Sequence, residues 1–533
     1  MGGTSKQANT DSGRECMRGT VTMRVVIALV LAAGVILWPM AEGFGAEPGR
    51  FFRIRVVDEQ TGRGVPLVEL RTVNNLRYYT DSNGIVAFYE PGLMGQRVFF
   101  SVESHGYTYP KDGFGYAGVA LEVKEGGAAE IRVKRLNIAE RLYRLTGEGI
   151  YRDSVLAGEP VPIRQPLLNG QVAGQDSVQA AVYRGRIYWF WGDTCRMRYP
   201  LGHFQTAGAT SELRGRGGLD PSVGVDLSYF IDEEGFSRKM CPMTRQGQSV
   251  LVWLDGVMTL PDEDGRERLV AHYSQMKDLG TRLEHGLAVF DDQTDTFVKA
   301  VEFDLREGWR FPQGHPVRMT EGGEYCLFPG PYPVVRVRAG LKQAKTPASY
   351  EAFTCLEPGS RYSKTSAKLQ RDPDGKLVWA WKADTDPVSQ AQEKELIDAG
   401  KLKSDEARFQ LCDVDTGKPV MLHNGSFCWN AFRKKWIMIG VQAGGTSFLG
   451  EVWFAEADSP TGPWRRARKV VTHDRYSFYN PTQHPFFDQD GGRVIYFEGT
   501  YATTFSGNAY PTPRYDYNQI MYRLDLADPR LRN

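Results

Sequence analysis

Residues 456–464 read Glu-Ala-Asp-Ser-Pro-Thr-Gly-Pro-Trp. They follow a strand-like run, residues 451–455, and precede a mixed basic and apolar run, residues 465–471. Proline presets φ for a turn and glycine accepts the positive φ that other residues avoid, so this stretch predicts a turn between two strands. Trp464 supplies a large apolar side chain where the second strand opens. The stretch therefore indicates a strand–turn–strand unit of an all-β protein.

Similar groups of short strands recur from about residue 151 to residue 533, at intervals of roughly 50 to 70 residues. The groups open near five positions, which are residues 178, 249, 314, 423 and 483. Repeated groups of short strands with many turn residues are typical of a β-propeller. We therefore predict a five-bladed β-propeller over residues 151–533.

The turn at residues 457–464, Ala-x-Ser-x-x-Gly-Pro-Trp, resembles the turn between outer blade strands in five-bladed propeller glycosidases. These are the arabinanase, xylosidase and invertase-like hydrolases. The resemblance implies a glycan-active enzyme with its cleft at one end of the propeller axis. In arabinanase-type propellers an Asp opens the first blade and a Glu acid comes from a middle blade. Asp176 fits the first place, but no middle-blade Glu stands in a matching context.

Residues 50–136 predict a separate β-sandwich, because short alternating strands and turn residues follow one another closely. Residues 56–70, VVDEQTGRGVPLVEL, and 78–91, YYTDSNGIVAFYEP, resemble the carboxypeptidase regulatory-like, transthyretin-like domain. Such a domain implies a spacer or docking role, without catalysis. Residues 137–150 predict a linker helix, with Asn137 as N-cap, Glu140 at the third helical position and Gly147 after its end.

The N-terminal 43 residues predict a signal peptide. Arg18 and Arg24 precede an apolar run, Val25 to Leu37, which is too short to span a bilayer comfortably. An uncleaved membrane anchor is the alternative. Without this segment the chain balances 61 basic and 61 acidic residues, which indicates no attraction to nucleic acid or anionic lipid. We expect a secreted or periplasmic protein, monomeric, that meets a polysaccharide or oligosaccharide and not a membrane.

The candidate catalytic residues are carboxyls at strand ends. Asp176 precedes the first strand of the first group, and Asp193 ends its second strand within Trp-Gly-Asp-Thr. Glycoside hydrolysis needs two carboxyls, one protonated and one ionised. The early Asp with a later Trp-Gly-Asp-Thr also resembles exported propeller hydrolases that cut arabinan. We expect Asp176 to be the base or nucleophile, and Asp193 or Glu498 to be the acid.

Other polar and aromatic residues at strand ends predict substrate binding; these are His315, His484, Arg514, Tyr517 and Trp191. The same set permits a polysaccharide lyase, in which an arginine neutralises a uronate and His or Tyr abstracts a proton. A third alternative is a non-catalytic carbohydrate-binding propeller with Trp189, Trp191 and Trp429 as stacking platforms. No metal or cofactor motif occurs, although His315, His423 and His484 could cluster with a structural cation on the axis.

Overall fold

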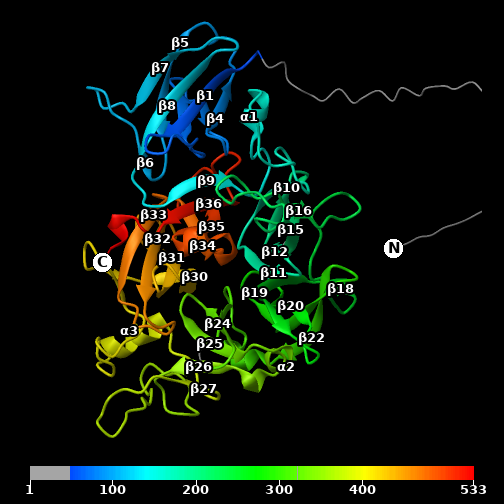
Figure 1. Ribbon diagram of the computed structural model, residues 1–533, viewed down its shortest axis with the longest axis vertical. Coiled ribbons are helices and arrows are strands. Elements are labelled where there is room, and N and C mark those ends of the chain that lie inside the picture. Colours follow the sequence, from blue (N-terminus) through cyan, green and yellow to red (C-terminus); the bar gives the residue numbers. More distant parts are fainter. Residues whose placement is uncertain (1–48, 204, 321, 533) are drawn as a thin grey trace, which may run out of the picture. The chain divides into compact units, whose positions relative to one another are not determined.

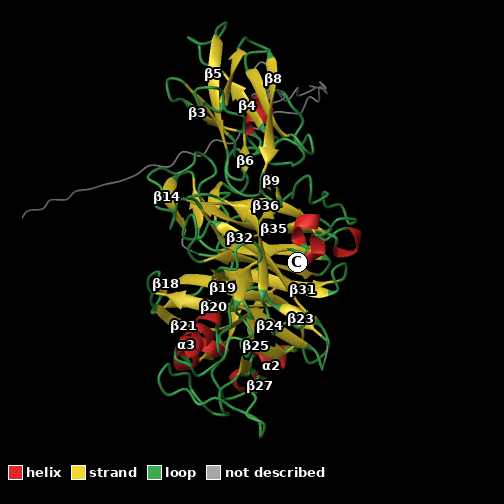
Figure 2. Cartoon of the chain, turned by 90° about the vertical axis from the view of Figure 1, so that its left-hand side faces the viewer, coloured by secondary structure: helices red, strands yellow, loops and turns green. Residues whose placement is uncertain are grey.

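The computed structural model describes residues 49–203, 205–320 and 322–532. Strands are the main regular secondary structure in this part of the chain, and helices are short (Figure 2). No helix within these ranges has the length and apolar character of a membrane-spanning segment. The predicted signal peptide, residues 1–43, lies outside the described residues.

Two four-stranded sheets form the N-terminal β-sandwich (Figure 1). The first sheet has the order β4-β1-β8-β6, with bounds Ile85–Phe88, Phe52–Asp58, Ala128–Arg135 and Tyr107–Thr108. The second has the order β3-β2-β5-β7, with bounds Arg77–Tyr79, Glu69–Thr72, Arg97–Glu103 and Gly118–Glu122. Alternate residues of β5 are buried, as the period of a strand requires, and Phe100 on this strand joins Ile54 and Phe88 in the sandwich core.

The rest of the chain forms a five-bladed propeller, which confirms the predicted fold class. Blade one contains β11 Gln179–Tyr183, β12 Arg186–Trp191, β15 Ala207–Glu212 and β16 Ser228–Tyr229. Blade two contains β19 Leu251–Pro261, β20 Glu267–Met276, β21 Arg282–Asp291 and β22 Thr296–Phe303. Blade three contains β23 Val317–Met319, β24 Tyr325–Pro329, β25 Pro333–Arg338, β26 Glu351–Thr354 and β27 Ala380–Lys382.

Blades four and five complete the ring. Blade four contains β30 Leu422–Asn430, β31 Lys435–Gln442, β32 Glu451–Ala457, β33 Arg466–Thr472, β28 Leu411–Asp413 and β29 Pro419–Val420. Blade five contains β34 Ser477–Gln483, β35 Val494–Ala502, β36 Asn518–Asp525 and β9 Glu140–Arg144. The Gly-Pro-Trp turn joins β32 to β33 as predicted, and Trp464 is fully buried in the core of this blade.

Shorter elements decorate the blades. A three-stranded sheet beside blade one contains β10 Val172–Gln175, β13 Thr194–Arg196 and β14 Tyr199–His203. A hairpin before blade two contains β17 Thr244–Arg245 and β18 Gln248–Ser249. The α-helices are α1 Arg152–Leu156, α2 Leu341–Ala344 and α3 Gln390–Asp398. The 3₁₀ helices are η1 Leu305–Arg310, η2 Pro347–Ser349, η3 Pro485–Phe487, η4 Asp490–Gly492 and η5 Pro529–Leu531.

The predicted linker helix at residues 137–150 is wrong. Residues 140–144 form the strand β9, which pairs antiparallel with β36 and supplies the outer strand of blade five. All five residues of β9 are buried. The side chain of Asn137 accepts a hydrogen bond from the backbone of Thr472, far away in the sequence, instead of capping a helix. The open edge of β36 needs a hydrogen-bonding partner, and this tertiary requirement overrides the local helical pattern.

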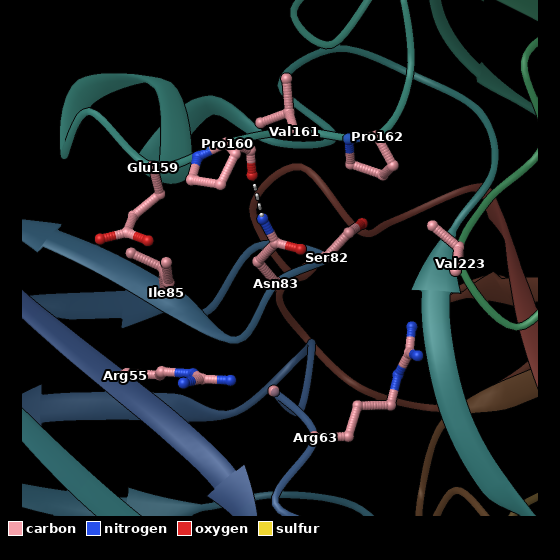
Figure 3. Close-up of a pocket in the computed structure, with 11 residues that line it drawn as sticks. Arg55, Arg63, Ser82, Asn83, Ile85, Glu159, Pro160, Val161, Pro162 and Val223 are labelled. Atoms are coloured by element: carbon pink, nitrogen blue, oxygen red, sulfur yellow. Dashed lines mark hydrogen bonds between the residues drawn. The ribbon is translucent and has the colours of Figure 1, made fainter.

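A pocket of about 490 Å³ lies where the sandwich meets residues 159–162 (Figure 3). Asn83 joins the two segments, because its Nδ2 donates to the carbonyl oxygen of Pro160 at 3.2 Å. Arg55 and Arg63 extend into the pocket, and Glu159 is its single carboxylate. The pocket therefore lacks the pair of carboxyls that glycoside hydrolysis requires.

Candidate active site

Asp176 and Asp193 meet at one end of blade one. Strand β10 pairs antiparallel with β13, and Gln175 lies opposite Thr194 in this pairing. The residues next to that pair are therefore brought together. The backbone N–H of Asp193 donates to Oδ1 of Asp176 at 3.0 Å, and the backbone N–H of Asp176 donates to the carbonyl of Asp193 at 3.3 Å. The backbones of Asp176 and Asp193 are therefore adjacent.

Three aromatic side chains from other parts of the chain contact the two carboxyls. The phenol of Tyr479, on β34, donates to Oδ2 of Asp176 at 3.1 Å, and the phenol of Tyr517 hydrogen-bonds to the same carboxyl group. The indole Nε1 of Trp253, on β19, donates to Oδ1 of Asp193 at 2.9 Å. Sequence reasoning found Tyr517 but missed Tyr479 and Trp253, because nothing in their local sequence marks them as different from core aromatics.

The pKa values of the two carboxyls are raised. Burial, followed by the charge of Asp193, raises the pKa of Asp176 to about 7 and outweighs the hydrogen bonds from Tyr517 and Tyr479. Burial raises the pKa of Asp193 to about 6, against the hydrogen bond from Trp253. The higher pKa of Asp176 favours a state in which Asp176 is protonated while Asp193 is ionised. Hydrolysis by an acid paired with a base or nucleophile needs this division of protonation.

The pair lines a pocket of about 570 Å³ formed by strand residues and loops of several blades. Among the described residues that line it there is no lysine or arginine. The remaining titratable groups are Cys195, His423, Tyr479 and Tyr517. Burial lowers the pKa of His423, so this side chain is neutral near pH 7. The pocket therefore offers a ligand two carboxyls and neutral groups, and no cation to pair with an acidic sugar.

Backbone strain is concentrated at this pocket. Four residues that line it have positive φ although they are not glycine: Ser177 at 54°, Asn480 at 50°, Phe505 at 64° and Tyr517 at 59°. The left-handed region is unfavourable for bulky side chains and costs of order 1–3 kcal/mol per residue. Such strain persists where the surrounding structure holds it, and it is frequent at functional sites.

Glu498 does not join the acid pair. It lies on β35, fully buried, and its Oε1 is 2.7 Å from Nε2 of His484. The ring of His484 packs edge-to-face on Trp189 of blade one, with 5.0 Å between ring centroids. These side chains occupy the interior between blades five and one. The sequence predicted Glu498 at a strand end, but β35 continues to Ala502, so Glu498 lies at the middle of the strand and its side chain contacts His484 between the blades.

Of the other predicted binding residues, Tyr517 alone lines the pocket. Nε2 of His315 lies 2.7 Å from Oγ1 of Thr482, and burial together with His484 lowers the pKa of His315 to about 3. Arg514 pairs with Glu148, its Nε lying 3.2 Å from Oε2. Trp191 is 1% exposed and stacks on Trp189, so it belongs to the core. His315, His484, Arg514 and Trp191 are therefore corrected to positions outside the pocket.

Of the three histidines expected to cluster, His423 lines the pocket, whereas His315 contacts Thr482 and lies near enough to His484 for that side chain to lower its pKa. Within the described ranges, no group of three or more His, Cys, Asp or Glu side chains could hold a metal ion.

One further carboxyl, that of Asp255, accepts hydrogen bonds from three blades. It accepts from the backbone N–H groups of Gly256 and Gly314 at 2.8 Å each, and from Nε2 of Gln179 at 3.1 Å.

Comparisons with known proteins complete this description. No protein-family model matches the chain, and no curated protein matches it. Among solved structures, a putative exo-β-1,3-galactanase from Bifidobacterium bifidum s17 is 12% identical with a TM-score of 0.34, covering 73% of this chain and 94% of its own. The GH43_1 enzyme from Xanthomonas citri complexed with xylotriose is also 12% identical, with a TM-score of 0.31, covering 67% and 88%.

The exo-β-1,3-galactanase from Phanerochaete chrysosporium, complexed with β-1,3-galactotriose, is 8% identical with a TM-score of 0.32, covering 68% of this chain and 65% of its own. TM-scores below 0.5 at such identities assign neither a family nor an activity. The assignment of the propeller rests on the five sheets described above.

Proposed function

We propose that this protein is a glycoside hydrolase that cleaves an uncharged glycan with Asp176 and Asp193. One observation carries the proposal: two carboxyls with raised pKa values meet in a single pocket, through the contact between the Asp193 backbone and Oδ1 of Asp176. A pair that shares one proton between about pH 6 and 7 suits acid-assisted cleavage of a glycosidic bond. The resemblance of the Gly-Pro-Trp turn and of Trp-Gly-Asp-Thr to propeller hydrolases supports the same reaction.

Asp176 is the proposed acid and Asp193 the proposed base or nucleophile. This order reverses the expectation from the sequence, and the reason is the higher pKa of Asp176, which burial and the Asp193 charge produce. In the cycle, Asp176 gives its proton to the leaving oxygen while the Asp193 carboxylate attacks the sugar or activates a water. Tyr479 and Tyr517 then stabilise the carboxylate that forms on Asp176.

The lyase alternative lacks its cation. Elimination from a uronate requires a positive group beside the sugar carboxylate, and Arg514 pairs with Glu148 outside the pocket. The binding-module alternative relied on exposed tryptophans. Trp189 and Trp191 are buried, and Trp429, which is 50% exposed, lies outside the pocket.

We also propose that the enzyme acts as an exported monomer, supported by the apolar run Val25 to Leu37 after two arginines and by the balanced charge.

The test compares two leaving groups. Asp176→Asn and Asp193→Asn should each lose at least about 100-fold in rate on a natural glycan. On an aryl glycoside with an acidic phenol, Asp176→Asn should recover because that leaving group needs no proton, while Asp193→Asn should stay inactive. Asp488→Asn is the matched control, since burial also raises the pKa of Asp488 to about 7 but its carboxyl lies outside the pocket. Full activity of both pair variants would refute the proposal.

A further inference from the structure

Three loops from three blades place large apolar side chains around the mouth of the carboxyl pocket. Leu279 lies between β20 and β21, Phe448 between β31 and β32, and Phe505 between β35 and β36. Their exposed fractions are 72%, 53% and 61%. Single exposed apolar residues are ordinary, but convergence of three from separate loops on one pocket indicates a surface that a ligand covers.

Phe505 contacts a residue that is hydrogen-bonded to the proposed acid. Its backbone has φ of 64°, where a bulky residue is unfavourable, so the surrounding loop imposes its position. Its ring meets Tyr479 edge-to-face, with 6.1 Å between centroids. Tyr479 in turn donates to Asp176. The exposed ring is therefore placed next to the residues that hold the proposed acid.

A neutral sugar fits such a surface. One face of a sugar ring presents C–H groups that pack on an aromatic ring, while its hydroxyl groups reach polar side chains at the edge. The pocket supplies those polar groups in Ser177, Asn480 and Thr504, and no lysine or arginine is among the described residues of its lining. A charged sugar would instead need a cation to offset the loss of its hydration.

We propose, as an extension of the proposed function, that Phe505 and Phe448 are stacking platforms that bind consecutive units of an uncharged oligosaccharide. Phe505 carries the sugar nearest the carboxyl pair, and Phe448 carries a neighbouring unit of the same chain. Substrates of two or more units bind better than a monosaccharide, because a single ring covers one platform only.

The experiment measures binding without cleavage. In the full chain carrying Asp193→Asn, calorimetric titration uses arabino-, xylo- and galacto-oligosaccharides of one to four units. We expect affinity to rise between one and two units. Phe505→Ala and Phe448→Ala should each lower the affinity for the tightest-binding oligosaccharide at least 10-fold. Phe505→Tyr should retain the parent's affinity. Phe432→Ala is the matched control, since Phe432 is 43% exposed in the turn between β30 and β31 on the same blade as Phe448.

The outcomes separate this proposal from the hydrolase proposal. If Phe505→Ala and Phe448→Ala bind every oligosaccharide as well as the parent does, the platforms are refuted even where the wild type cleaves glycans. If both variants lose affinity while the wild type releases no new ends, the platforms stand and hydrolysis fails. If Phe505→Ala or Phe448→Ala lost more affinity for charged uronate oligomers than for neutral oligomers, this result would also overturn the platform assignment. In the active chain, Phe505→Ala should raise KM and leave the pH profile in place, whereas a role confined to holding Tyr479 would move that profile.

Discussion

The Cβ that Gly192 lacks would lie 2.3 Å from Oδ1 of Asp176. A non-bonded Cβ does not approach an oxygen so closely, so the glycine of Trp-Gly-Asp-Thr allows the Asp176 carboxyl to occupy its present position. Because the following residue is Asp193, one glycine fixes the distance at which the Asp193 N–H can donate to Asp176. The packing of the Asp176 carboxyl against residue 192 therefore explains why Trp-Gly-Asp-Thr has a glycine at this position.

Gly192→Ala should therefore inactivate the enzyme while leaving it folded. The added methyl group displaces the Asp176 carboxyl, and we expect a loss of at least about 100-fold in kcat/KM, since general acid catalysis is worth that much or more. Gly308→Ala is the control, because a Cβ at Gly308 meets nothing within 4 Å. Equal activity of the two variants on a natural glycan would show that the position of the Asp176 carboxyl does not matter.

The rate of glycan cleavage should follow a bell-shaped pH profile. Activity requires Asp193 ionised and Asp176 protonated, so kcat/KM should rise through about pH 6 and fall through about pH 7. Steady-state rates between pH 4 and pH 9 check this. A plateau from pH 5 to pH 9 would contradict the shared proton.

Single donors to the pair should move the two limbs of that profile separately. Trp253→Phe removes a hydrogen bond that lowers the pKa of Asp193, so the acidic limb should move to higher pH. Tyr479→Phe removes a hydrogen bond that lowers the pKa of Asp176, so the basic limb should move to higher pH. Trp429→Phe, outside the pocket, should move neither. If the acidic and basic limbs lie at the same pH in all three variants, these donors do not set the pKa values of Asp193 and Asp176.

The raised pKa of Asp176 should also appear in stability. Its folded pKa of about 7 exceeds the unfolded value of about 3.9, so the folded state holds this proton more tightly. The resulting contribution is present below about pH 4 and is lost as the pH rises through 7. The Tm of Asp176→Asn minus the Tm of the wild type should therefore be larger at pH 8 than at pH 4, by about 2 °C or more. Calorimetry at the two values of pH checks this, and a lower Tm at pH 8 would indicate a structural role for the charge.

Strand β9 should matter more for stability than a linker would. Leu142 is fully buried in the outer strand of blade five, so Leu142→Ala should cost about 2–5 kcal/mol in the free energy of unfolding. Leu136→Ala is the control, since Leu136 is 58% exposed, and its effect should be within about 0.5 kcal/mol. Urea titrations measure both. Similar values for the two variants would show that β9 does not close the propeller.

The sequence alone determined the β class, the repeat of five strand groups and the turn at Gly-Pro-Trp, because alternation and turn residues act over a few positions. It also located Asp176, Asp193 and Tyr517, since strand ends in a propeller gather at one cleft. Tertiary structure alone decided that residues 140–144 complete blade five, because the edge of β36 lies about 380 residues away. It likewise turned Glu498 and Trp191 into the interior and brought Tyr479 and Trp253 to the carboxyls. Side-chain direction and long-range pairing depend on how blades pack together, and neither is encoded in local spacing.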